Sequence, residues 1–178
     1  MIDSQPTPNT PIPVRQAIIE INDNDALASA CELWSKKPLL AVDTEFMRVN
    51  TFYPQAAVLQ INDGENNYLI DPLGITDWRE FGALLENPGV IKALHACSED
   101  LDVFYTLIGC VPKSMLDTQM AAAFLGYGAG VGYGNLVEQC VGVVLPKGET
   151  RSNWLARPLS QAQINYAALD VDYLYEIA

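Results

Sequence analysis

An aspartate and a glutamate stand two residues apart at the end of a short apolar run, residues 39–46. The run is rich in leucine and valine and follows Pro38, which predicts a buried β-strand. Asp43 and Glu45 would project from one face of that strand, roughly 7 Å apart along it. Two carboxylates that enter a protein core repel each other and lose hydration, so they require compensation. A divalent cation is the simplest compensation; exposure of the strand end to solvent, or neutralisation by Arg48, is the alternative.

A second acidic position, Asp100, lies where a helix is expected to begin. Residues 90–95 indicate a strand. Ser98 can then cap a helix over residues 98–108, which Gly109 would end. An acid in the first turn of a helix stabilises the helix dipole by ~0.3–1 kcal/mol, so a purely structural role is the alternative for Asp100.

Tyr166 and Asp170 form a third candidate pair, in the last predicted helix. Ser160 and Gln163 match the capping-box pattern that starts such a helix. A spacing of four residues puts Tyr166 and Asp170 on one helix face, and the neighbouring Leu169 predicts that this face is half-buried. An ordinary tyrosine–aspartate surface pair is the alternative.

The composition predicts one globular domain without a membrane segment. The 178 residues are 49% hydrophobic and 18% charged, which excludes a disordered chain. No apolar stretch approaches the ~20 residues that span a bilayer. The four scattered cysteines argue against structural zinc or a disulfide framework and favour a reducing, cytoplasmic setting. A net charge of −12 argues against an extensive basic surface for nucleic acid, but it is compatible with a local cation site for phosphate.

The remaining pattern predicts an α/β fold: a mixed sheet covered by helices on both faces, with the strand that carries Asp43 in the centre. Asp63-Gly64 is a strong hairpin signal between two apolar runs. The proline-rich residues 1–13 are expected to form a flexible leader, and a helix still in progress at Ala178 predicts a longer protein. Strands are expected over residues 39–46, 56–62, 67–73 and 90–95, and residues 14–21 contain a short apolar run. Helices are expected over residues 23–35, 76–85, 98–108, 117–126, 135–140 and 160–178.

The three acidic motifs, in this order, resemble those of the DEDD exonuclease superfamily. A tyrosine four residues before the last aspartate is typical of the DEDDy branch; the related branch has a histidine five residues before it, where this chain has Asn165. Residues 41–46, 95–101, 116–119 and 151–159 also resemble segments of the ribonuclease D family, and the resemblance covers residues 38–178.

The resemblance implies a ribonuclease H-like mixed sheet flanked by helices, the DEDD exonuclease fold, over residues 14–178. Ribonuclease D proteins continue into helical C-terminal HRDC domains that help to bind RNA. No segment of these 178 residues resembles those domains, so we expect weaker substrate binding but unchanged chemistry.

The resemblance also implies a pair of divalent cations, Mg²⁺ or Mn²⁺, typically ~3.5–4 Å apart. Hard carboxylate oxygens suit these ions better than zinc. Asp43 would bridge both ions, and Glu45 and Asp170 would complete the ion that carries the attacking water. Asp100 would hold the second ion near the leaving 3′ oxygen. Tyr166 would orient the water, because a phenol with an ordinary pKa near 10 is a poor general base.

Contacts with the terminal base are expected from residues that flank the acidic motifs. Phe46 or Met47 would wedge against the base; a core side chain at a strand end is the alternative. His95, the only histidine, would contact substrate, or would be a hydrogen-bonded structural residue. Asp117 is interpreted first as a helix N-cap, with support of a ligand as the alternative.

Basic residues before the last helix are candidates for phosphate binding. Lys147, Arg151 and Arg157 would meet substrate phosphates, or would be solvated surface charges. The glycine-rich residues 126–134 are not a phosphate-binding loop, because they follow a helix and lack the Gly-Lys-Ser/Thr ending.

The predicted activity is metal-dependent 3′–5′ exoribonuclease hydrolysis that releases 5′-mononucleotides from RNA 3′ ends, with tRNA precursors as the expected substrate. We expect a cytoplasmic monomer without a membrane partner. A 3′–5′ DNA exonuclease acting on single-stranded DNA and a non-catalytic RNA-binding domain on the same fold are the alternatives.

Overall fold

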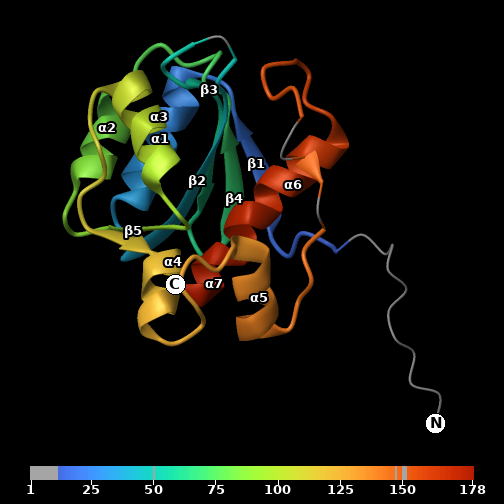
Figure 1. The fold of residues 1–178 in the computed structure, drawn as a ribbon. Coiled ribbons are helices and arrows are strands. Elements are labelled where there is room, and N and C mark those ends of the chain that lie inside the picture. Colours follow the sequence, from blue (N-terminus) through green and yellow to red (C-terminus); the bar gives the residue numbers. More distant parts are fainter. Residues whose placement is uncertain (1–11, 50, 147, 150–151) are drawn as a thin grey trace.

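A six-stranded mixed sheet forms the centre of the molecule (Figure 1). The computed structural model describes residues 12–49, 51–146, 148–149 and 152–178. The strand order is β1-β4-β3-β2-β5-β6, so the strand that carries Asp43 and Glu45 is central, as predicted. β3 is antiparallel to both of its neighbours, and the other pairs are parallel. The strands are β1 (Ala17–Ile21), β2 (Leu39–Met47), β3 (Gln55–Asn62), β4 (Asn66–Ile70), β5 (Ile91–Leu94) and β6 (Met115–Asp117).

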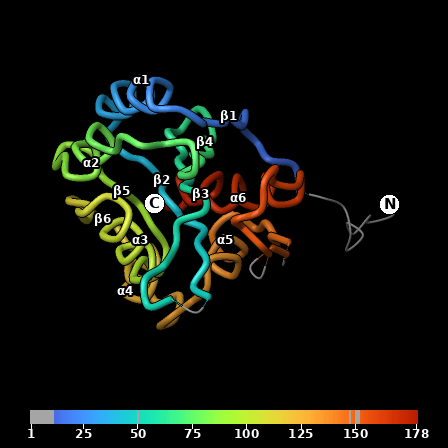
Figure 2. The backbone as a smooth tube through the Cα atoms, turned by 90° about the horizontal axis from the view of Figure 1, so that it is seen from above, coloured from blue at the N-terminus to red at the C-terminus, as the bar shows by residue number. Residues whose placement is uncertain are grey.

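Helices cover both faces of this sheet, which confirms the predicted α/β class. Seen from above, α1, α2 and α3 lie on one side of the central strands and α5 and α6 on the other (Figure 2). The helices are α1 (Asn24–Trp34), α2 (Arg79–Glu86), α3 (Ser98–Ile108), α4 (Thr118–Phe124), α5 (Tyr133–Val141), α6 (Gln161–Asp172) and α7 (Leu174–Ile177).

Side chains alternate between the two faces of β2, and this alternation determines which of them point toward the site. Leu40 and Val42 pack in the large core under α1, α2 and α3. Ala41 points the other way and packs against Val171 of α6 and the α7 residue Leu174. Because side chains alternate along a strand, Asp43 shares the face of Ala41 and is directed toward α6.

Local signals account for several helix boundaries. The Asp23 carboxylate caps α1 by accepting a hydrogen bond from the Ala26 amide at 2.8 Å. Gly109 ends α3 with a φ of 83°, a left-handed conformation that glycine adopts without strain. The capping box of Ser160 and Gln163 is present at the start of α6.

Three boundary predictions are wrong. Ser98 is the first residue of α3, and Cys97 occupies the N-cap position instead. The short strand β6 falls in a segment where no strand was expected. The last helix ends at Asp172 and is followed by the separate helix α7, rather than continuing without interruption.

None of the described helices has the length and apolar character that a bilayer-spanning helix requires. Residues 1–11 of the predicted leader lie outside the described residues.

Candidate active site

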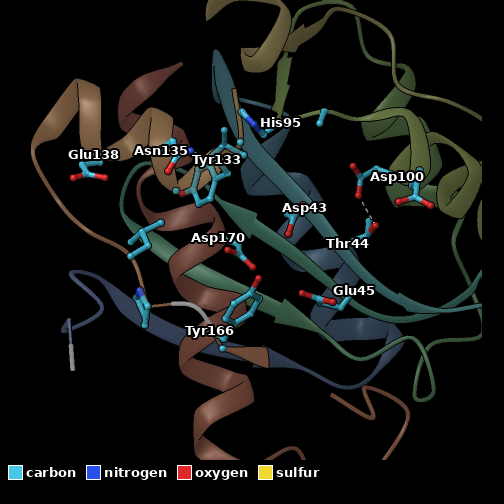
Figure 3. Close-up of a pocket in the computed structure, with 18 of the residues that line it drawn as sticks. Asp43, Thr44, Glu45, His95, Asp100, Tyr133, Asn135, Glu138, Tyr166 and Asp170 are labelled. Carbon is cyan, nitrogen blue, oxygen red and sulfur yellow. Dashed lines mark hydrogen bonds between the residues drawn. The ribbon is translucent and has the colours of Figure 1, made fainter. Parts of the chain in front are cut away.

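The predicted catalytic residues meet in an open pocket at the carboxyl ends of β2 and β5. The pocket has a volume of about 810 Å³ and is bounded by β2, the start of α3, α5 and α6 (Figure 3). Its lining includes the following polar and aromatic side chains: Asp43, Thr44, Glu45, Phe46, His95, Asp100, Tyr133, Asn135, Glu138, Tyr166 and Asp170.

Three carboxylates form a compact cluster inside this pocket. Asp43, Glu45 and Asp170 each offer one oxygen, and these oxygens lie within 4.8 Å of one another. β2 supplies the first two, and α6 brings the third across the sheet because Ala167 and Val171 pack on the strands below. Three half-buried carboxylate oxygens at this spacing fit a hard divalent cation.

Burial and mutual repulsion raise the pKa of every member of the cluster. Burial, followed by the charges of Asp43 and Asp100, raises the pKa of Glu45 to about 9. Burial is also the main cause that raises the pKa of Asp43, with Asp100 and Asp170 adding to it. The pKa of Asp170 rises by burial and by the charge of Glu45. The cluster therefore favours neutral carboxyl groups unless positive charge is supplied.

Asp100 lines the same pocket but stands outside the compact cluster. Its Oδ1 accepts a hydrogen bond of 2.5 Å from the Thr44 hydroxyl on β2. Burial raises the pKa of Asp100 to about 6, against the effect of this hydrogen bond. Asp100 is thus held at the edge of the cluster, in a position to contribute a fourth carboxylate.

Asp117 fixes the turn that leads into α3. Its carboxylate caps α4 by accepting from the Gln119 amide at 2.8 Å, which confirms the predicted N-cap. The same carboxylate also accepts from the amides of Ala96 at 3.1 Å and Cys97 at 3.2 Å. Ala96 has a φ of 56°, which is unusual for a residue with a side chain. Asp117 therefore stabilises a strained turn directly before Asp100.

Tyr166 lies one helical turn before Asp170 on α6 and projects into the pocket. Its hydroxyl points toward Asp170 and Glu45 (Figure 3). Burial, and then the charges of Asp170, Glu45 and Asp43, raise the pKa of the Tyr166 phenol well above its ordinary value. The hydroxyl is consequently protonated at neutral pH and acts as a hydrogen-bonding group.

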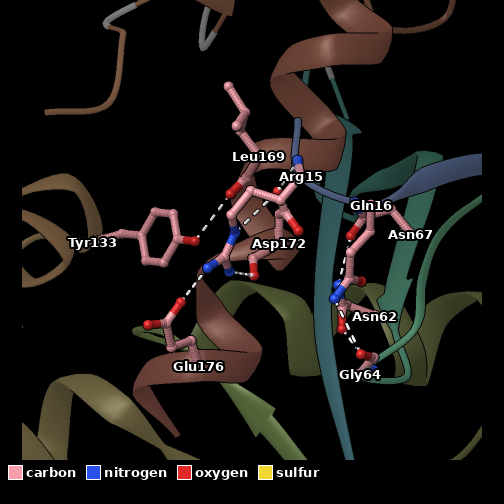
Figure 4. Close-up of polar contacts among 9 residues, drawn as sticks. All are labelled: Arg15, Gln16, Asn62, Gly64, Asn67, Tyr133, Leu169, Asp172 and Glu176. Atoms are coloured by element: carbon pink, nitrogen blue, oxygen red, sulfur yellow. Dashed lines mark hydrogen bonds and ion pairs between the residues drawn. The ribbon is translucent and has the colours of Figure 1, made fainter. Parts of the chain in front are cut away.

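Two contacts hold the end of α6, where Asp170 is located (Figure 4). The Tyr133 hydroxyl donates to the Leu169 carbonyl at 3.0 Å. On the other side, the Arg15 guanidinium donates to the Asp172 carbonyl at 2.6 Å, and the Arg15 amide donates to the Asp172 carboxylate at 2.7 Å. The backbone is thus fixed by other parts of the chain one residue before Asp170 and two residues after it.

Two residues were predicted to contact the terminal base, Phe46 and Met47, and they have different surroundings. Phe46 lines the pocket. Met47 is not among the lining residues and packs against the apolar cluster that contains Val58 and Trp154. The geometry is therefore compatible with a base contact for Phe46 and gives Met47 a core role.

His95 lines the pocket, but both of its ring nitrogens contact protein atoms. Nδ1 lies 2.9 Å from the Thr118 hydroxyl and Nε2 lies 3.0 Å from the Val131 carbonyl. Gln119 donates to the same carbonyl at 3.1 Å. Burial lowers the pKa of His95. This arrangement matches the structural alternative, with the imidazole holding the loop that precedes α5.

Arg157 is separate from the pocket. Its guanidinium donates to the two carboxylate oxygens of Asp71 at 2.6 and 2.8 Å, and also to the Ala57 carbonyl at 2.7 Å. These contacts engage the guanidinium within the fold and do not match the predicted contact of Arg157 with substrate phosphates. Lys147 and Arg151 lie outside the described residues, and their phosphate contacts stay predictions.

Three pocket residues on α5 were not predicted from the sequence. Tyr133, Asn135 and Glu138 line the pocket, and the Tyr133 ring lies nearest to Asp170 (Figure 3). They follow a glycine-rich segment. The sequence pattern that could have predicted them is a helix start with two polar residues three positions apart. That spacing is common on solvent-exposed helices, so it does not single out a site.

Comparison with known proteins places this geometry in a family. The chain matches the family model described as 3′-5′ exonuclease over residues 18–178. It is 52% identical to ribonuclease D of Pseudomonas paraeruginosa and 50% identical to ribonuclease D of Escherichia coli, each over 157 residues. Each match covers 88% of this chain and 42% of the relative, so the chain spans less than half the length of these curated proteins.

Comparison with solved structures also finds ribonuclease D. The crystal structure of Escherichia coli RNase D matches with a TM-score of 0.88 at 49% identity, over 91% of this chain and 43% of that one. Brucella melitensis NrnC, in a complex with pGG, matches with a TM-score of 0.76 at 26% identity, over 91% of this chain and 78% of that one. The chain belongs to the 3′–5′ exonuclease family, and within that family it is similar to the ribonuclease D proteins.

Proposed function

We propose that this chain is the catalytic domain of a metal-dependent 3′–5′ exoribonuclease of the ribonuclease D type. The observation that carries the proposal is the cluster of Asp43, Glu45 and Asp170, with oxygens within 4.8 Å, beside the protonated hydroxyl of Tyr166. Family membership supports the reaction class. The Escherichia coli relative, described as an exoribonuclease involved in structured RNA processing, supports RNA as the substrate.

The carboxylates would hold two divalent cations, for which the oxygen donors favour Mg²⁺ or Mn²⁺. Asp43, Glu45 and Asp170 would hold one, and Asp43 with Asp100 the other. When bound, such cations lower the pKa of the attacking water and stabilise charge on the leaving oxygen. The raised carboxyl pKa values are consistent with this role, because a bound cation offsets both the burial and the repulsion that cause them.

Tyr166 would orient the nucleophile. Its hydroxyl points between Glu45 and Asp170, where it can hydrogen-bond a water molecule directed at the terminal phosphodiester. Because the pKa of this phenol is raised, it is poorly suited to remove a proton. Its contribution would be to hold the water in line with the leaving 3′ oxygen.

The substrate would enter the open side of the pocket with its 3′ end first. Phe46 would contact the terminal base, on the wall formed by β2. The small number of basic residues, 10 in the whole chain, suits a site that binds one or two nucleotides rather than a long duplex. In the cell we infer a cytoplasmic monomer that trims tRNA precursors.

Parallel digestion of matching RNA and DNA strands tests the substrate class. Each 5′-labelled strand would be incubated with the protein in Mg²⁺, in Mn²⁺ and in EDTA. We expect metal-dependent shortening of the RNA that exceeds shortening of the DNA. Faster digestion of DNA would indicate a DNA exonuclease, and binding of RNA without nucleotide release would indicate a binding domain.

A further inference from the structure

Gln60 of β3 lies directly opposite Asp43 in the sheet. Residues paired across antiparallel strands project from the same face, so the Gln60 side chain shares the face of Asp43 and lies under α6. The register is regular at this pair, because the irregularity of the β2–β3 ladder comes later, between Glu45 and Phe46.

The amide of Gln60 is buried without a hydrogen bond. The residue is 0% exposed, and neither Nε2 nor Oε1 has a partner among the described residues. By contrast, the side chain of Asn62, the next residue of β3 on the same face, donates a hydrogen bond to the side chain of Asn67 on β4 at 2.7 Å. Burying an amide without a partner is unfavourable, and no contact within the described fold offsets it.

The Gln60 amide can hydrogen-bond to the carboxylate of Asp43, the residue paired with it across the two strands. Cβ atoms of a directly opposed pair are about 4.5–5.5 Å apart, which is within the combined reach of a glutamine and an aspartate side chain. An amide N–H is a neutral donor that favours the ionised form of a carboxylate.

We propose that Gln60 is a positioning residue of the cation site: with cations bound, its Nε2–H, which has no partner in the described fold, donates to one oxygen of Asp43 and leaves the other directed into the pocket. This inference rests on the proposed function, because it assigns Asp43 to the cations. It adds a residue from the neighbouring strand, which the pocket lining does not include. Gln60 acts through Asp43 and does not touch the substrate.

Gln60→Met tests the inference, since methionine has a similar length and no amide. Gln163→Met is the matched control: Gln163 is also buried, at 5% exposure, but its amide accepts from the Ser160 amide at 2.9 Å and donates to the Asn153 carbonyl at 3.3 Å. Two quantities would be measured for each protein, the melting temperature in EDTA and the Mn²⁺ dissociation constant by calorimetric titration.

The two variants are expected to behave in opposite ways. Gln60→Met should keep or raise the melting temperature in EDTA, because an unpartnered amide is removed, and should weaken Mn²⁺ binding ~10–100-fold. Gln163→Met should lower the melting temperature by about 2–8 °C and leave Mn²⁺ binding unchanged. A merely structural role for Gln60 would move the melting temperature alone.

Unchanged Mn²⁺ affinity in Gln60→Met would overturn the inference. If that variant does not fold, Gln60→Leu replaces it in the same titration, with the same expected loss. The titration does not depend on RNA cleavage. A wild-type protein that binds Mn²⁺ but releases no nucleotide would therefore refute the proposed activity and still leave the role of Gln60 decided by the titration.

Discussion

At the scale of single residues, the site is a concentration of negative charge that the fold alone does not neutralise. Asp43, Glu45 and Asp170 lie within 4.8 Å of one another, and the described residues bring no lysine or arginine into the pocket lining. Burial, together with this repulsion, raises the pKa of each of these carboxyl groups. A group of acids in this state binds protons or cations, and each single substitution has a defined consequence.

Asp43→Asn should abolish nucleotide release and stabilise the protein in EDTA, because it removes a cation ligand and one source of repulsion. The release of 5′-mononucleotides and the melting temperature measure the two effects. Glu20→Gln, which changes an exposed acid on the edge strand β1, is the control and should alter neither. Retention of more than a few per cent of the activity by Asp43→Asn would refute its assignment.

Tyr166→Phe should lower the turnover number by ~10²–10³ and leave Mn²⁺ affinity unchanged, because the hydroxyl orients water but is not a ligand. Single-turnover kinetics at saturating Mn²⁺ separates the two quantities. An unaffected rate would remove the tyrosine from the mechanism.

At the scale of elements, the position of Asp170 depends on how α6 is fixed at its end. Tyr133 of α5 donates to the carbonyl of Leu169, one residue before Asp170. Arg15, which precedes β1, donates to the carbonyl of Asp172, two residues after Asp170. Arg15 also forms an ion pair with Glu176 of α7. The helix that carries the third carboxylate is thus connected to both ends of the described chain.

Arg15→Ala should lower the free energy of unfolding by ~1–3 kcal/mol, because it leaves the fully buried carboxylate of Asp172 without a charged partner. Denaturant unfolding measures the change. Lys36→Ala is the control: its pair with Glu32 is exposed, so the expected loss is at most ~0.5 kcal/mol. Equal losses in the two variants would show that Arg15 contributes no more than a surface ion pair.

Sequence patterns predicted the elements that carry the acids because those elements have strong local signals. β2 is a continuous apolar run, and α6 begins with a capping box. Other features depend on tertiary contacts that no local pattern contains. The strand β6 is only three residues long and exists through pairing with β5. The engagement of Arg157 by Asp71, which is distant in sequence, could not be derived from either segment alone.

The candidate site, like the fold, could be predicted from the sequence only in part. Motif spacing put Asp43 and Glu45 on one strand face and Tyr166 and Asp170 on one helix face, and the resemblance to the DEDD exonucleases predicted that the two pairs meet. It did not identify Tyr133, because the approach of α5 to α6 is decided by packing across the molecule.

At the scale of the whole molecule, the unliganded site opposes the stability of an already acidic protein, with a net charge of −12. A carboxyl group whose pKa is raised in the folded state stabilises the fold below its unfolded pKa. That stabilisation is lost as the pH rises through the folded pKa. For Glu45 this window extends from its ordinary 4.5 to about 9.

The melting temperature in EDTA should consequently fall as the pH rises from about 5 to 9. Addition of Mn²⁺ should raise it, and the increase should grow with pH, because the cation binds the deprotonated carboxylates. Differential scanning calorimetry with and without Mn²⁺ measures both trends. A melting temperature in EDTA that rises over this pH range would contradict the origin of the pKa shifts.

The most direct measurement is the product pattern from a 5′-labelled single-stranded RNA incubated with the wild-type protein in Mn²⁺ and in EDTA. With Mn²⁺ we predict a ladder that shortens one nucleotide at a time from the 3′ end, with 5′-mononucleotides as the released product. With EDTA the RNA should stay intact. Internal fragments, or shortening that persists in EDTA, would contradict a metal-dependent 3′–5′ exonuclease.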